Sequence, residues 1–161
     1  MSRHKDIAEE VKQVVEAWAS VNWVAATVRR GWLVEELGSL VNDEDPIVLA
    51  VIPTTVTDNS DVQGSRGSDG DLIDVSIVVM GRADGIANSD LDDIDDKTEQ
   101  LRDHVRKFRS ASVGGYDFQL ESIALTTAFD HESLNQQELW ASLIVAQYSV
   151  DVDSLPEVAQ V

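Results

Sequence analysis

Apolar residues recur at every third or fourth position in two segments of the chain, which predicts two amphipathic helices. The first segment begins at Asp6 and ends near Ser20, and its apolar positions are Ile7, Val11, Val14, Val15 and Trp18. The second follows Ser89, a good N-cap, and is expected to be the longest helix; its apolar stripe consists of Leu91, Ile94, Leu101, Val105 and Phe108. We expect both helices to pack this apolar side on a sheet.

Two segments in the middle of the chain have the patterns of strands. Residues 47–52 are apolar throughout, which predicts a central strand covered on both faces, opened by Pro46 and closed by Pro53. Residues 71–82 alternate instead. Their better core face consists of Ile73, Val75, Ile77 and Val79.

Weaker patterns complete the order of elements. Residues 25–30 predict a short first strand, and residues 33–41 predict a brief helix or turn. Gly114 and Gly115 turn the chain into a strand over residues 118–127, and residues 139–150 supply the last strand.

This order predicts a single α+β domain over residues 1–150, with a mostly antiparallel sheet of about five strands packed against two helices. Residues 151–161 are expected to form a loose C-terminal tail. Residues 55–70, TVTDNSDVQGSRGSDG, contain turn-forming residues with almost nothing to bury. They predict a flexible loop, and a loop of this length is usually functional or disordered.

The charge of the chain limits what it can bind. Thirty Asp and Glu face twelve Lys and Arg, giving a net charge of −18. Because nucleic-acid binding depends on Lys and Arg that displace counterions, a grip on DNA or RNA is disfavoured. The acid is mostly Asp and Lys is scarce, a balance that resembles proteins of halophilic archaea and their viruses. An ordinary acidic mesophilic protein is the alternative.

No common catalytic or metal-binding pattern is present in the sequence. Residues 64–70 are glycine-rich but lack the lysine of a phosphate loop, and His4, His104 and His131 lack the spacing of a zinc pair. These histidines are expected on the surface. The acidic residues 90–96 have helical periodicity, which favours a solvated helix face over a calcium loop. We expect no enzymatic activity, no cofactor and no metal.

The tryptophans and the overall hydropathy give expectations about the core and about membrane association. The four tryptophans are spread over separate elements, which favours core packing over base stacking. The chain has no cysteine, and neither a signal peptide nor a membrane span is expected from its hydropathy.

The element order resembles that of tail terminator (tail-completion) proteins of tailed viruses, over nearly the whole chain. The segments that carry this resemblance follow an amino-terminal helix: ATVRRGWLVEELGSL leading into PIVLAVIPT, then DLIDVSIVVMGR, DLDDIDDKTEQLRDHVRKF and ELWASLIVAQYSV. Together with the acidic composition, this indicates a virus of a halophilic archaeon. Related neck proteins match the same pattern almost as well.

The resemblance implies a structural role without catalysis. Family members form rings of identical subunits, usually six, that cap the finished tail tube and face the head connector. The protein would belong to the tail or neck of the virion, after assembly in the host cytoplasm. DNA would pass through such a ring as a cargo that acidic residues repel.

The resemblance also suggests which residues lie at an interface with another subunit or with the tail tube. Family members have extended loops that reach a neighbour, and residues 55–70 match them in length and position. Arg66 is the strongest single candidate there, and Arg82 comes second. Arg29 and Arg30 are equally compatible with an interface and with a solvated strand end. The complete candidate set is Asp58, Asp61, Arg66, Asp69, Arg82, Arg29 and Arg30.

Two alternatives remain open from the sequence. One is another neck protein, such as a head-completion or stopper protein. The other is an acidic soluble binding module of a halophilic cell, which the composition alone supports.

Overall fold

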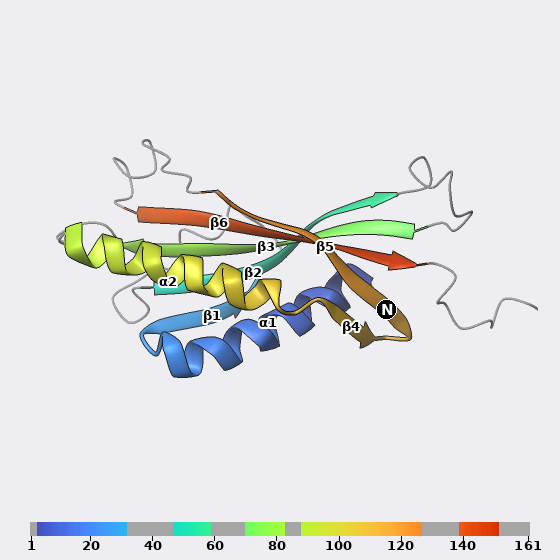
Figure 1. The fold of residues 1–161 in the computed structure, drawn as a ribbon, viewed down its shortest axis with the longest axis horizontal. Coiled ribbons are helices and arrows are strands. Elements are labelled where there is room, and N and C mark those ends of the chain that lie inside the picture. Colours follow the sequence, from blue (N-terminus) through green and yellow to red (C-terminus); the bar gives the residue numbers. More distant parts are fainter. Residues whose placement is uncertain (1–2, 32–46, 59–69, 83–87, 127–138, 152–161) are drawn as a thin grey trace, which may run out of the picture.

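A computed structural model describes residues 3–31, 47–58, 70–82, 88–126 and 139–151, which form an α+β fold of two helices and six strands (Figure 1). The elements are α1 (Arg3–Asn22), β1 (Ala26–Arg30), β2 (Ile47–Asp58), β3 (Gly70–Arg82), α2 (Asn88–Arg106), β4 (Ser110–Val113), β5 (Tyr116–Thr126) and β6 (Leu139–Asp151). The predicted fold class is confirmed, but the sheet has six strands where about five were expected.

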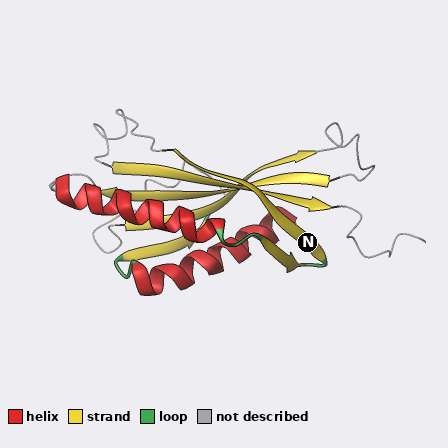
Figure 2. Ribbon diagram, in the orientation of Figure 1, coloured by secondary structure: helices red, strands yellow, loops and turns green. Residues whose placement is uncertain are grey.

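The strands form one sheet in the order β1-β2-β3-β6-β5-β4. β1 and β2 are parallel, and the four other pairs are antiparallel. β4 is the strand that the sequence analysis missed. It has only four residues, SASV, of which Ala111 and Val113 pack against the core. This alternation is too short to stand out in the sequence. Figure 2 shows the long strands crossing as a twisted sheet.

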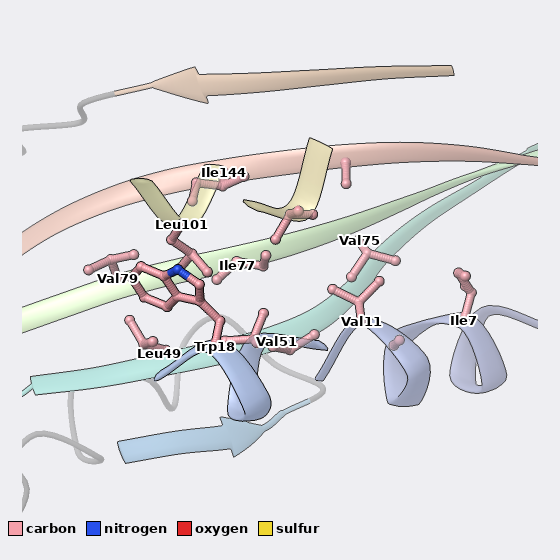
Figure 3. Packing of buried hydrophobic residues seen from close by; sticks show 14 of the residues in the cluster. Ile7, Val11, Trp18, Leu49, Val51, Val75, Ile77, Val79, Leu101 and Ile144 are labelled. Carbon is pink, nitrogen blue, oxygen red and sulfur yellow. The ribbon is translucent and has the colours of Figure 1, made fainter. Parts of the chain in front are cut away.

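Both helices lie on the same side of the sheet (Figure 1). α1 contacts β1 to β4, α2 contacts β5 and β6, and the helices contact each other. Figure 3 shows Ile7, Val11 and Trp18 of α1 directed at the sheet. The residues of the sheet that face them are fully buried and include Leu49, Val51, Val75, Ile77, Val79 and Ile144. Burial of each such side chain stabilises the fold by roughly 1.5–3 kcal/mol before the loss of conformational entropy is counted.

The predicted core face of β3 is confirmed, and the opposite face of the sheet carries a second, smaller cluster. Ile73, Val75, Ile77 and Val79 are all 0% exposed on the helical side. The second cluster contains the buried Val48, Ala50, Ile52 and Met80. The apolar run in β2 is therefore buried on both faces, as its continuous hydrophobicity predicts. β2 lies second in the sheet order, between β1 and β3.

Pro53 does not end β2, contrary to the sequence prediction. The strand continues to Asp58, and its register with β3 shifts between Pro53 and Thr55. A proline lacks the N–H that a ladder needs, and a bulge is a position where a strand tolerates this loss. Residues 55–58 therefore belong to β2 and Gly70 belongs to β3, so the predicted loop is too long at both ends. Its remaining residues, 59–69, lie outside the described part of the chain.

A second bulge interrupts the alternation of β5. The register with β6 shifts between Leu120 and Ser122. Phe118 and Leu120 precede this shift and Ile123 and Leu125 follow it, yet all four pack against the main core. The extra residue explains why a simple period of two does not describe this strand.

The helix boundaries differ from the predicted ones by a few residues. α1 continues to Asn22, and with 20 residues it is longer than α2, which has 19. Ile94, Leu101 and Val105 of α2 are buried as predicted, whereas Phe108 lies beyond the helix and is half-buried.

Some predicted features can be compared with the structure only in part. Trp18 and Trp23 are buried, in agreement with their predicted role in packing, and their rings meet edge to face at 6.3 Å. Trp32, residues 33–41 and residues 152–161 lie outside the described residues.

Candidate interaction surfaces

The acidic and basic residues of helix α2 are segregated along its length, and a candidate interaction surface lies at each end of the helix. Its first half carries Asp90, Asp92, Asp93, Asp95, Asp96 and Glu99, with Lys97 as the one cation. Its second half and the residues that follow carry Arg102, Arg106, Lys107 and Arg109, with Asp103 as the one anion. The basic group thus holds four of the chain's twelve Lys and Arg residues. The acidic residues lie towards the amino end of the helix and the basic residues towards its carboxyl end, where each group interacts favourably with the helix dipole.

The basic end of α2 borders a groove against β5. The groove has a volume of about 380 Å³ and is lined by Arg106, Arg109, Leu120, Glu121, Ser122 and Ile123. Arg106 reaches Asp103 at 3.8 Å, and its side chain is about half exposed. Among the described residues, Arg109 makes no ion pair. Glu121 accepts a hydrogen bond from the Ser149 hydroxyl at 2.6 Å, so its carboxylate is engaged on β6. The lining carries two guanidinium groups and one carboxylate, which gives it a net positive charge in a strongly acidic chain.

The same groove contains a strand edge that no described strand covers. β4 pairs only with residues 116–119 of β5, and the Leu120 N–H donates to the carbonyl of Arg109 at 2.7 Å. Beyond that point the ladder of β5 continues with β6 alone. Residues 122–126, SIALT, carry no charge. Natural sheets usually protect a free edge with charged residues or proline, so this segment has the character of a contact surface.

The second surface lies where α1 turns into β1. Val21 and Val24 are 79% and 80% exposed. Between them, the carbonyl of Asn22 accepts a hydrogen bond from Lys97 Nζ at 2.9 Å. This bond supplies a cation to the carboxyl end of α1, which has no basic residue in its own last turn. It also holds the two valines beside the acidic half of α2.

Arg30 joins β1 to α1 and does not project into solvent. Its Nε lies 3.2 Å from Glu9 Oε1, its side chain is 12% exposed, and its Nη1 donates to the carbonyl of Gly31 at 2.5 Å. Arg29 is exposed and belongs to the opposite face of β1, level with Ala50 of β2. Both residues lie within β1, in agreement with the strand predicted over residues 25–30. The structure thus separates two neighbours that the sequence treated as one candidate pair.

The other predicted interface residues are placed only in part. Asp58 is the last residue of β2 and Arg82 is the last residue of β3. β2 and β3 are antiparallel, so these two residues mark opposite ends of the sheet. Asp61, Arg66 and Asp69 lie outside the described residues. The described part of the chain therefore does not bring the predicted set together.

His104 is packed against Trp18, which corrects the prediction of a plain surface histidine. The two rings lie 6.4 Å apart, and the histidine is half-buried between α2 and α1. Desolvation by burial lowers the pKa of His104 below its usual value, and the nearby charge of Lys107 lowers it further. Its imidazole thus belongs to the contact between the helices.

Within the described ranges, no group of three or more His, Asp or Glu residues is placed to hold a metal ion. The described helices include none with the length and hydropathy of a membrane span. Residues 92–96 lie on α2, where Asp92, Asp93 and Asp96 are exposed. This agrees with the helical interpretation of the acidic run.

Comparison with protein-family models and with curated proteins gives no match for this chain.

The sequence predicted Arg106 and Arg109 as cations that close the second helix, and it assigned neither these residues nor Val21 and Val24 to an interface. Four basic residues within residues 102–109 of a strongly acidic chain were the available signal for the first two. The valines had no signal, because their exposure depends on the direction in which the chain leaves α1.

Proposed function

We propose that this protein is a structural virion assembly protein, a tail terminator that caps the tail tube as a ring of identical subunits and joins it to the neck. The observation that carries the proposal is the order of elements along nearly the whole chain. The chain has helix α1, the strands β1 to β3, helix α2 and the closing strands in that order, which supports the proposal.

The surface chemistry supports an assembly role. A ring requires two different patches on each subunit, because a patch that binds its own copy closes a dimer. The chain presents a basic groove at one end of α2 and an acidic, valine-bearing surface at its other half. In a ring, the net charge of −18 would repel DNA phosphates and let the DNA pass.

A measurement of mass with and without tail tubes tests this proposal. Sedimentation in molar salt is expected to give an assembly of several 17.7-kDa chains, six in the simplest case, that also co-sediments with tail tubes. A single chain under both conditions would contradict the proposal. An unrelated protein of equal negative charge controls for non-specific co-sedimentation.

Another neck protein and an acidic binding module remain the alternative candidates. Location within the virion separates a terminator, which contacts the tube directly, from a stopper, which contacts the connector. A ligand-dependent rise in melting temperature, without assembly, would instead support the binding module.

A further inference from the structure

We infer that the groove between α2 and β5 is the docking site for the α1–β1 turn of a second copy of this chain. The occupant would insert Val21 and Val24 over the apolar part of the groove and place its acidic residues beside Arg106 and Arg109. This inference rests on the proposed ring, because only an assembly of identical chains requires both surfaces on one subunit.

Charge complementarity is the first argument for this occupant. On a chain with a net charge of −18, two copies repel each other through most of their surfaces. The basic end of α2 is the exception among the described elements. Exposed Asp93 and Asp96 of the neighbouring copy lie on α2 within about one turn of Lys97, whose ammonium group reaches the Asn22 carbonyl between the valines. Pairing the two surfaces relieves repulsion where other contacts would increase it.

Apolar complementarity is the second argument. Val21 and Val24 are among the most exposed large hydrophobic residues in the described part of the chain. The groove offers half-buried Leu120 and Ile123 beside the arginines. The uncharged edge of β5 also presents open backbone groups to the entering turn. Central apolar contacts surrounded by charges are typical of specific interfaces.

The other exposed edge of the sheet is a poorer partner. An edge-to-edge contact between β1 of one copy and β5 of the next would use a strand that carries the exposed Arg29. This cation would approach a groove that is itself lined by Arg106 and Arg109, and like charges repel. The turn after α1 avoids this conflict, and it gives a contact between two different patches, as ring closure requires.

Two variants, each with one surface disabled, test the contact. Arg106→Glu/Arg109→Glu removes the groove charge, and Val21→Ser/Val24→Ser removes the apolar projections. Each variant alone is expected to lose assembly in sedimentation or native mass measurements, with at least a tenfold weaker association for a loss of about 1.4 kcal/mol or more. Lys5→Glu is the matched control for a charge reversal, because this exposed residue near the start of α1 lines neither the groove nor the turn after α1, and it is expected to assemble like the wild type.

Mixing the two variants decides the identity of the occupant. One variant keeps an intact groove and the other keeps an intact turn, so the mixture is expected to form a one-to-one dimer and nothing larger. Circular dichroism of each variant checks that its fold is retained. A mixture that stays monomeric, or a groove variant that assembles like the wild type, would overturn the inference. If the wild type forms rings and both variants assemble equally well, this contact is rejected and the proposed function stands. If the wild type is monomeric both free and with tail tubes, the contact and the proposed function are both rejected.

Discussion

Gly114 shows how one residue fixes the position of the β4–β5 hairpin against α1. It has φ of +63°, and Gly115 has φ of +83°, a backbone that residues with a Cβ rarely adopt. A Cβ at Gly114 would also lie 2.6 Å from Asp6 Oδ2. Asp6 is 9% exposed, so its carboxylate has little room to move away. A side chain at this position would therefore strain both the hairpin and its contact with the start of α1.

Gly114→Ala is expected to destabilise the protein by about 2 kcal/mol or more, because an L-residue in the left-handed region costs about 1–2 kcal/mol and the clash with Asp6 adds to it. Chemical denaturation measures this change. In an Asp6→Ala background the same substitution is expected to cost less, since only the backbone cost remains. Equal costs in both backgrounds would show that Asp6 does not constrain the turn.

His104 gives a prediction about pH. Its pKa is lowered in the folded protein, so the unfolded chain binds more protons in the window below about pH 6.5. The contribution of His104 to stability therefore falls as the pH falls through that window. His104→Gln is expected to reduce the loss of unfolding free energy between about pH 7.5 and 5 relative to the wild type. A variant with the wild-type pH dependence would disprove this contribution.

At the level of elements, the sequence predicted those parts whose periodicity is long and uninterrupted. The sequence predicted α1, α2 and the core face of β3 because their apolar residues repeat over several helical turns or several strand alternations. β4 and the continuation of β2 past Pro53 were not visible, because one is short and the other depends on a bulge. The groove also escaped prediction, since it joins residues 106–109 to residues 120–123 through the tertiary fold.

The bulge in β5 provides a prediction for an element. Deletion of Glu121 removes the extra residue but leaves Ile123 opposite Ala146 and Leu125 opposite Ile144, so both half-buried side chains stay on the core face. The deletion is therefore expected to cost clearly less than the roughly 3 kcal/mol that loss of their apolar burial would cost, as chemical denaturation can measure. Glu121→Ala keeps the bulge and serves as the control for the loss of the side chain. A deletion that cost roughly 3 kcal/mol more than the control would show that the core face of this strand depends on the bulge.

At the level of the whole molecule, charge is the dominant property. If the acidity is an adaptation to concentrated salt, repulsion among the carboxylates should destabilise the fold in dilute buffer, where the Debye length is about 10 Å at 0.1 M salt and about 3 Å at 1 M. The melting temperature is expected to rise steeply between these conditions. Equal melting temperatures would contradict the adaptation and favour an ordinary acidic protein.

The proposed ring combines this charge with two complementary surfaces on each subunit. Uniform acidity would keep the chains apart, and the basic groove supplies the exception that directs one copy to the next. A surface of this kind allows association with a defined partner while the rest of the assembly repels nucleic acid.

Electron microscopy of tail tubes mixed with the purified protein in molar salt tests the central claim most directly. We predict a ring of density at one end of each tube, absent when the protein is omitted. Bare tube ends in the presence of excess protein, or binding distributed along the tube wall, would contradict the account.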